Sequence, residues 1–440
     1  MKRLRVIILL LLIIGVVIQF IRPSLPNPPV TGDLKAPPEV KAILERDCYD
    51  CHSNQTQLKW FDQPAPAYWM VAQDVKDGRK VLNFSNWDSL TKGQQAGKLF
   101  ESIFQIEQKA MPLSSYTFLH HGGIITSEEI GVLKQYAGTL AYHPVPDTAR
   151  ERAAEQQYEH WTKVVGPAAV KDEYNGIAYG ELAGFASWQV VSTTERYDNG
   201  TMRVIFGNPI LIKAIREGHT NPYPDGAIFA KAAFDQLPDS SGEILTGAFK
   251  QVEFMIRDSK KYASTFGWGW ARWVGGLALN PYGKDASFVT ECLNCHRPLD
   301  KTDHTFTFPL ADSLRVAEVM VSQPDSLAFV LRGKVVTSFV DTKYRTMSTL
   351  YSTKAVNSLG GYAPGTVLSL VTWNQREDPH WFGGRIPQTV QSVEQIQIGA
   401  DGKPEYTVYA GPNLPKKEMA AEQVAHRVQY ITAKRAAVIP

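Results

Sequence analysis

The sequence predicts a multidomain protein with one N-terminal transmembrane helix, an all-α domain, and then two α+β domains that are mainly antiparallel β. Three observations support this fold class. A basic and then apolar segment opens the chain, helix signals follow over residues 36–143, and a set of strand-like segments then occurs twice in one order. Such self-similarity indicates two copies of one structural unit.

Three basic residues, Lys2, Arg3 and Arg5, precede an apolar run that continues to Phe20. Positive charge before an apolar core keeps the N-terminus in the cytoplasm and directs the remaining chain across the membrane. The run is short for a bilayer span of about 20 residues and suits a signal peptide equally well. Because no small-x-small cleavage site follows Phe20, we expect residues 1–22 to stay as an anchor in the bacterial inner membrane, with the bulk in the periplasm.

The composition is otherwise that of a soluble protein, with 44% hydrophobic and 20% charged residues. The formal net charge is +2, which gives no electrostatic case for a nucleic-acid partner. After the anchor, the length suffices for two or three domains, each with a core of its own.

Two pentapeptides contain all four cysteines of the chain: Cys48-Tyr-Asp-Cys51-His52 and Cys292-Leu-Asn-Cys295-His296. Thioethers from two such cysteines tether a haem, and the adjacent histidine supplies an iron ligand, so the pattern is typical of c-type haem attachment. A disulfide, a thioredoxin-like redox pair or a zinc site can also use Cys-x-x-Cys, but none of them requires the histidine. We therefore predict two covalently bound haem c groups.

Residues 36–143 are predicted to form a wholly helical domain. Pro37 and Pro38 open a helix just before Cys48, and the apolar residues of that helix fall on one face. The segment Thr126-Ser-Glu-Glu129 is a capping box that begins the closing helix. A helix at each end, with a haem motif after the first, is the layout of a small cytochrome c.

Met111 is the candidate for the sixth iron ligand of this first haem. It lies far enough beyond His52 to reach the opposite haem face, and the proline that follows places it on a turn. A thioether ligand raises the haem potential and blocks substrate. A methionine packed in the core is the alternative, and His120 and His121 are rival ligands, although a loop histidine is usually exposed.

Three separated motifs of this domain are Cys48 to Thr56, Asp77 to Ser85, and Met111 to Tyr116 with Leu119-His120. Together they resemble the haem-binding domain family of bacterial exported proteins. The resemblance extends over almost all of the first domain, and it implies a haem that is ligated by His52 and Met111.

A helical connector is expected over residues 144–175, because a charged, alanine-rich stretch of good helix formers ends there at a Gly-Pro pair. The strand-like part is predicted to form two copies of one domain, residues 176–310 and 311–415. Residues 416–440 suggest a C-terminal helix and tail without further chemistry.

The two copies share short anchors in the same order. Val190-Val-Ser-Thr193 recurs as Val335-Val-Thr-Ser338, and Gln251-Val-Glu-Phe254 recurs as Ser392-Val-Glu-Gln395. The second copy has no cysteine, so we expect it to hold no covalent haem. It is expected to form a dimer-like pair with the first copy within one chain.

Lys231 lies on a predicted strand that ends at Phe234, and it aligns with Leu370 of the second copy. The lysine therefore occurs only in the copy that has the haem motif. Alternate residues of a strand share a face, which groups Lys231 with Ala227 and Phe229. Such a lysine lies either on a solvent-facing edge or in a pocket, where desolvation lowers its pKa and favours a nucleophilic amine.

Four segments of the first copy resemble the cytochrome P-460 family: Met202 to Asn208, Tyr223 to Lys231, Phe266 to Trp270, and Cys292 to His296. In that family a c-type haem carries an additional bond from a lysine to a porphyrin carbon, and its iron, ligated by one histidine, oxidises hydroxylamine. The resemblance implies that Lys231 takes the place of that lysine and that His296 ligates iron opposite an open face. The second copy is similar to a haem-free relative.

One feature departs from the family, whose catalytic members place a glutamate a few residues before the first haem cysteine to accept a proton. Here Ser287-Phe-Val-Thr290 fills that stretch, and the nearest carboxylates are Asp285 and Glu291. The candidate catalytic residues are therefore Lys231, Glu291 and Asp285. We expect no ligand role for two further histidines, His304 and His380.

The resulting expectation is an exported dihaem cytochrome. Its open-face haem would oxidise or bind hydroxylamine or nitric oxide and pass electrons to the haem of His52 and Met111. The redox partner would be a periplasmic cytochrome or a membrane oxidase. The alternatives are a gas-binding protein for nitric oxide or carbon monoxide, similar to cytochrome c′-beta, an electron-transfer cytochrome, and a peroxide reductase.

Overall fold

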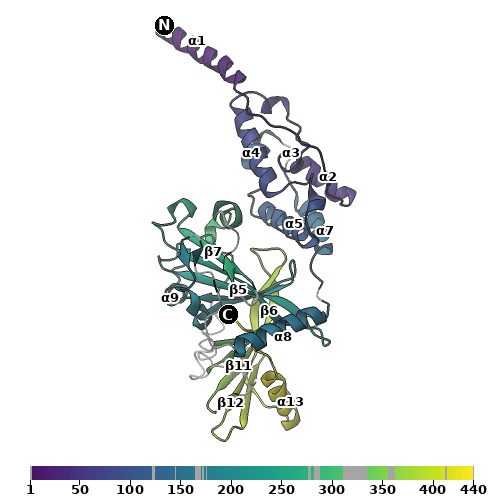
Figure 1. Ribbon diagram of the computed structural model, residues 1–440, viewed down its shortest axis with the longest axis vertical. Helices are drawn as coiled ribbons and strands as arrows, with labels where there is room; N and C mark the ends of the chain where they lie inside the picture. Colours follow the sequence, from purple (N-terminus) through teal and green to yellow (C-terminus); the bar gives the residue numbers. More distant parts are fainter. Residues whose placement is uncertain are drawn as a thin grey trace. The chain divides into compact units, whose positions relative to one another are not determined.

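The computed structural model describes residues 2–120, 124–143, 145–163, 170, 173–174, 176–275, 279–281, 288–310, 334–354, 362–411 and 414–439. The chain divides into two compact units, Met1–Ala141 and Tyr142–Pro440. The first unit is helical, and the second is built mainly from antiparallel strands (Figure 1).

The first unit begins with α1 (Lys2–Val17), which a short 3-10 helix, Ile18–Phe20, extends. The window Arg3–Phe20 has a mean hydropathy of 2.4 and no buried residue. Its length and composition suffice to cross a membrane, and a signal sequence meets the same criteria. The end of this segment contacts the helical domain, because the Gln19 amide donates to the Ala65 carbonyl at 3.1 Å and accepts from the Ala65 N–H at 2.8 Å.

The helical domain contains α2 (Pro38–Asp47), α3 (Tyr49–His52), α4 (Ala67–Val81), α5 (Lys92–Glu107), α6 (Ser114–Leu119) and α7 (Ser127–Thr139). The predicted helix start at Pro38 is confirmed. The predicted capping box is also confirmed, because the Thr126 hydroxyl accepts from the Glu129 N–H and the Glu129 carboxylate accepts from the Thr126 N–H. The most buried side chains include Val40, Leu44, Val75, Phe84, Phe100, Phe104 and Ala137.

The second unit begins with α8 (Thr148–Lys163), which lies across β6 (Figure 1). The Gln157 amide exchanges two hydrogen bonds with the backbone of Phe249 on that strand, at 2.7 and 3.0 Å. This helix, expected as a connector, therefore packs on the β unit.

The first half of the β unit is residues 176–310, and its second half is residues 334–432. The first half contains β3 (Gln189–Arg196), β4 (Thr201–Gly207), α9 (Pro209–Glu217), β5 (Ile228–Pro238), β6 (Glu243–Arg257), β7 (Trp268–Val274) and β8 (Asn280–Pro281). The second half contains β9 (Lys334–Asp341), β10 (Thr346–Ser352), β11 (Val367–Glu377), β12 (Gly384–Ile398), β13 (Pro404–Ala410), β14 (Lys416–Lys417) and α13 (Ala421–Thr432). Two short strands, β1 (Glu173–Tyr174) and β2 (Ile177–Ala178), lie at the start of the unit.

Strands β9 to β13 match β3 to β7 one by one, with 8, 7, 11, 15 and 7 residues in each set. Their registers also agree: Lys231 lies opposite Glu253 in the first half, and Leu370 lies opposite Glu394 in the second. The first strand of each half has a bulge, at Val191 and at Val336. The recurrence seen in the sequence thus extends to the hydrogen-bond pattern.

The two halves share one sheet. β6 pairs with β9 where Glu243 lies opposite Asp341, and β12 pairs with β3 where Gly384 lies opposite Arg196. Because β11 also pairs with β12, the path β3-β4-β5-β6-β9-β10-β11-β12 closes into an antiparallel barrel, to which each half contributes four strands. The two β domains that the sequence predicts are therefore joined, and each half pairs with the other through the same strand ends.

The two faces of β5 contribute to different cores. Ala232 and Phe234 pack with Trp373 in a core that both halves share. Phe229 packs on the other face, with Trp268 and Leu293. Lys231 lies on this second face, as the alternation of a strand requires.

Candidate functional site

The second cysteine motif lies on a tight turn beside a pocket. Cys292 lies in a π-helical turn, Phe288–Leu293, and Cys295 and His296 follow in α10 (Asn294–His296). All three residues line the pocket. The His296 Nδ1–H donates to the His304 carbonyl at 2.6 Å, which leaves Nε2 as the nitrogen available to a metal.

The alternatives to haem attachment find no support at either cysteine pair. None of the four cysteines forms a disulfide. Within the described part of the chain, no three His, Cys, Asp or Glu side chains form a group that could hold a metal ion. A zinc site would need four such ligands.

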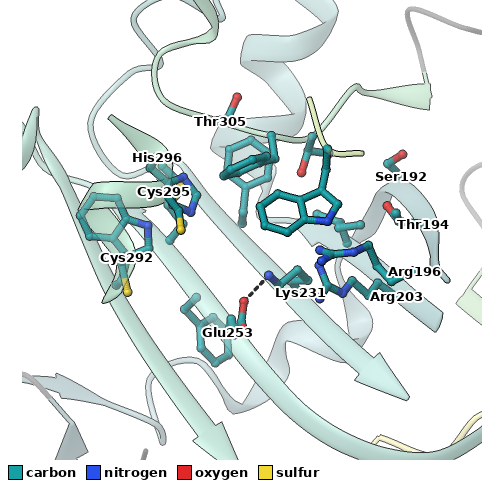
Figure 2. Close-up of a pocket in the computed structure, with 18 of the residues that line it drawn as sticks. Ser192, Thr194, Arg196, Arg203, Lys231, Glu253, Cys292, Cys295, His296 and Thr305 are labelled. Atoms are coloured by element: carbon teal, nitrogen blue, oxygen red, sulfur yellow. Dashed lines mark ion pairs between the residues drawn. The ribbon is translucent and has the colours of Figure 1, made fainter. Parts of the chain in front are cut away.

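Lys231 reaches the same pocket from β5 (Figure 2). Its Nζ forms an ion pair with Glu253 Oε2, and the two residues are direct neighbours across β5 and β6. Arg272 on β7 places its Nε 3.0 Å from Glu253 Oε1. The lysine side chain is 30% exposed. The sequence leaves two positions open for Lys231, a solvent-facing strand edge or a pocket. In the structure its side chain lines the pocket.

Burial changes the ionisation of this pair. It lowers the pKa of Lys231 to about 8, against the attraction of Glu253. Burial alone raises the pKa of Glu253, but the charges of Lys231 and Arg272 outweigh it and hold that pKa well below its usual value. A lysine pKa of about 8 leaves roughly a tenth of the amine neutral at pH 7, far more than at the ordinary lysine pKa.

Besides Arg272, two further arginines line the pocket. In the view of Figure 2, Lys231 lies between the cysteine turn and the side chains of Arg196 and Arg203. Burial lowers the pKa of Arg203 to about 9, and its buried Nε has no hydrogen-bond partner among the described residues. A buried guanidinium of this kind needs an acceptor, and a carboxylate such as a haem propionate suits it.

The pocket residues therefore fit a c-type haem. Cys292 and Cys295 supply thiols, His296 supplies a nitrogen, and Arg203 suits a propionate. Apolar side chains supply walls for the porphyrin: Ile205, Phe229, Phe254, Met255, Trp270, Ala271, Phe306, Phe308, Trp381 and Ile386.

Of the two carboxylates that are expected to be catalytic, Glu291 is described by the structure and Asp285 is not. Glu291 lines the pocket, but its side chain is 43% exposed and its Oε2 lies 3.9 Å from Arg272 Nη1. Asp285 lies outside the described residues. His304 contributes to the site through its backbone carbonyl, and its ring stacks on Phe266.

The first cysteine motif lies around α3 of the helical unit. The His52 Nδ1–H donates to the carbonyls of Gly78 and Leu82, each at 3.1 Å, so Nε2 is again the nitrogen available to a metal. Gly78 lets α4 approach closely, because a Cβ there would lie 2.9 Å from the Cys51 carbonyl oxygen and 3.3 Å from His52 Cε1. The thiols of Cys48 and Cys51 complete a donor set that fits a second c-type haem.

Met111 lies half-buried on the turn after α5, where its N–H donates to the Gln105 carbonyl. Its role as an iron ligand stays a prediction. His120 has both ring nitrogens engaged, Nδ1 with the Tyr116 carbonyl at 3.0 Å and Nε2 with Asp62 Oδ2 at 3.3 Å. A histidine held in this way is a poor rival for the iron, and His121 lies outside the described residues.

Five charged pocket residues are not predicted by the sequence: Arg196, Arg203, Glu253, Arg272 and Asp378. The sequence does mark Glu253, because this residue belongs to the segment Gln251–Phe254. That segment recurs in the second half with a glutamate, Glu394, at the same place. No local signal marks Asp378. It comes from the second half and reaches the pocket only through the pairing of the two halves.

Comparison with known proteins identifies two families in the chain. Residues 13–139 match the family described as haem-binding domain, and this match begins inside α1. Residues 182–307 match the family described as cytochrome P460. A search of curated proteins found no match.

Proposed function

We propose that this chain, which carries a haem-binding domain followed by a cytochrome P460 domain, is an exported dihaem oxidoreductase of the cytochrome P460 type. Its substrate is a small nitrogen species, hydroxylamine or nitric oxide. The observation that carries the proposal is the position of Lys231, whose amine lies in one pocket with Cys292, Cys295 and His296.

Each of these residues has a distinct task in the proposal. Cys292 and Cys295 tether the haem, and His296 ligates its iron through Nε2. Glu253 orients the Lys231 amine, the group that the resemblance to cytochrome P-460 would join to a porphyrin carbon, and the lowered pKa of this amine gives it a neutral fraction. When bound, the haem supplies an iron with one open face, at which a small molecule is oxidised or held.

The contact between Lys231 and Glu253 favours a second candidate function. This ion pair satisfies the amine without a bond to haem. If the pair persists in the haem-loaded protein, the β unit binds nitric oxide or carbon monoxide and is not an enzyme.

The first unit is an electron-transfer domain in this proposal. His52 and Met111 would hold its haem as iron ligands, and an iron with both of these ligands would have no position for a substrate. The engaged ring nitrogens of His120 support Met111 as the ligand. A periplasmic cytochrome or a membrane oxidase is the outside partner that takes the electrons.

The N-terminal helix is proposed to remain attached as an inner-membrane anchor. The residues that follow it are part of the helical domain: the Trp69 indole N–H donates to the Ile21 carbonyl at 2.5 Å, and the Tyr68 hydroxyl donates to the Pro23 carbonyl at 2.9 Å. Together with the Gln19 contacts to Ala65, these hydrogen bonds attach the end of the N-terminal segment to the helical domain, which favours its retention in the mature protein. The family match that begins inside α1 supports the same conclusion.

Intact mass and visible spectra of one purified preparation test these proposals. The wild-type mass should correspond to the whole chain with two haems, and the preparation should oxidise hydroxylamine. After denaturation, one haem should keep an abnormal, red-shifted spectrum, and Lys231→Ala should convert it to an ordinary c-type spectrum. Met111→Ala should abolish the sulfur-to-iron charge-transfer band.

Three opposite results would each reject one of these proposals. Ordinary spectra for both wild-type haems would rule out the cross-link and favour the gas-binding alternative. Persistence of the charge-transfer band in Met111→Ala would exclude Met111 as the ligand. A mass that lacks the first residues would reject the anchor.

A further inference from the structure

A loop from the second half of the β unit lines the pocket of the first half. The loop, residues 378–383, joins β11 to β12, and both Asp378 and Trp381 line the pocket. Ile386 on β12 lines it as well. The pocket that holds Cys292 and Lys231 is therefore not built by the first half alone.

Contacts on several sides hold this loop in place. The Trp381 indole N–H donates to Asp198 Oδ2 at 3.2 Å, and the Arg196 guanidinium lies over the Trp381 ring, 4.3 Å from its centroid. The His380 Nδ1–H donates to the Phe306 carbonyl at 2.9 Å. Because Phe306 lies in the segment just after the haem motif, the loop is joined to the first half at the site itself.

The corresponding loop of the first half is shorter. Residues 239–242, Asp-Ser-Ser-Gly, join β5 to β6, whereas the six residues Asp-Pro-His-Trp-Phe-Gly join β11 to β12. The carboxylate of the short loop serves the loop itself, because Asp239 Oδ1 accepts hydrogen bonds from Ser241 and Glu243. Asp378 Oδ1 accepts from the His380 N–H at 2.9 Å, and no hydrogen bond to Asp378 Oδ2 occurs among the described residues.

The surroundings of Asp378 suit a group that accepts protons near neutral pH. Burial raises the pKa of its carboxyl to about 6, although the His380 N–H and nearby arginines oppose the rise. Above that pH the carboxylate is ionised. The charged and titratable groups around it are Arg376 at the end of β11, Arg196 on β3 with its partner Asp198, Arg203 on β4, and His380 in the loop.

We propose that Asp378 is the proton acceptor of this pocket, so that the second half of the β unit completes the site that the first half begins. This inference rests on haem occupying the pocket, as proposed above. In hydroxylamine oxidation, each electron removed from the substrate goes to the outside one-electron acceptor by way of the haems. An N–H or O–H bond of the substrate breaks in step with it, and the proton passes to Asp378 Oδ2 and then to solvent.

Cyanide binding to the ferric holoprotein tests this role without any turnover. Hydrogen cyanide is a weak acid that is protonated at neutral pH and must give up its proton as its carbon binds iron, so a base in the pocket speeds binding. By stopped-flow absorption, the wild-type association rate constant should rise about tenfold between pH 5 and pH 7, with a midpoint near pH 6. Asp378→Asn should bind about tenfold more slowly at pH 7 and show no rise, and Asp378→Glu should restore it.

Asp239→Asn, the equivalent change in the first-half loop, is the matched control and should keep the wild-type profile. An unchanged profile in Asp378→Asn would overturn the proposal, even if the protein oxidises hydroxylamine. If the pH profile of cyanide binding depends on Asp378 but the protein does not oxidise hydroxylamine, only the proposed hydroxylamine oxidation is rejected. No cyanide binding at all would reject both. If the asparagine variant does not fold, a wild-type rate constant that stays flat between pH 5 and pH 7 would still overturn the proposal.

Discussion

The two halves of the β unit have the same strands in the same register, yet they cover the same face in different ways. In the first half, Lys231 faces a pocket with the cysteine turn. In the second half, Leu370 stands at the equivalent place and belongs to a core that includes Ile431 of α13, the helix drawn beside β11 and β12 (Figure 1). One backbone arrangement thus carries a cofactor pocket in one half and an ordinary core in the other.

The glutamate opposite this position is present in both halves but has different partners. Glu253 pairs with Lys231, whereas Glu394 accepts hydrogen bonds from Arg427 of α13 at 2.6 and 2.7 Å and from the Tyr406 hydroxyl at 2.5 Å. α13 therefore supplies both the apolar cover and the positive charge. The difference teaches that this face of the sheet requires a cover, and that the choice of cover decides what the half can do.

The largest expected effect comes from making the first half as free of cysteine as the second. The double variant Cys292→Ala/Cys295→Ala should carry one covalent haem where the wild type should carry two, because it lacks both thiols that are proposed to form thioethers in the pocket. Intact mass and a haem stain of the denatured chain measure the number. The matched variant Cys48→Ala/Cys51→Ala should lose only the other haem. Retention of two covalent haems by either double variant would contradict the assignment.

A smaller effect is expected from truncating a side chain of α13 in the core of the second half. Ile431→Ala removes a side chain that is 1% exposed in the core of the second half, and it should lower the free energy of unfolding of the β unit by about 2–4 kcal/mol. The haem spectra should not change, because α13 covers no part of the described pocket. His426→Ala, an exposed position of the same helix, is the control. Denaturant unfolding gives the stability, and a loss below about 0.5 kcal/mol would show that α13 is not an essential cover.

The smallest effect concerns the pH dependence of the first half. The pKa of Glu253 is held well below its usual value in the folded protein, so its stabilising contribution is present above about pH 4.3, the ordinary glutamate pKa, and is lost as the pH falls below it. Glu253→Gln should therefore be less stable at pH 7 by about 1–2 kcal/mol and should lose less stability than the wild type on acidification. Unfolding curves from pH 7 to pH 3 measure this. The exposed Glu405→Gln should follow the wild type, and parallel curves for Glu253→Gln would mean that the carboxylate is not stabilised by its partners.

Local patterns predict a large part of this structure. The helix start at Pro38 and the capping box at Thr126 are confirmed, because both depend on a few neighbouring residues. Strand alternation correctly groups Lys231 with the face of Phe229. The C-terminal helix is predicted as well. Its role as the cover of the second half is not predicted, because its contacts to Leu370 and Glu394 join distant parts of the chain.

By itself, the sequence determines the features whose chemistry is contiguous: the two cysteine motifs, the helix ends, and the recurrence of one set of strands. Tertiary structure alone decides which side chains meet in the pocket, Glu253 from the neighbouring strand and Asp378 from the other half. The reason is that these contacts depend on strand register and barrel closure between distant segments, and a shift of one residue would turn each side chain to the opposite face.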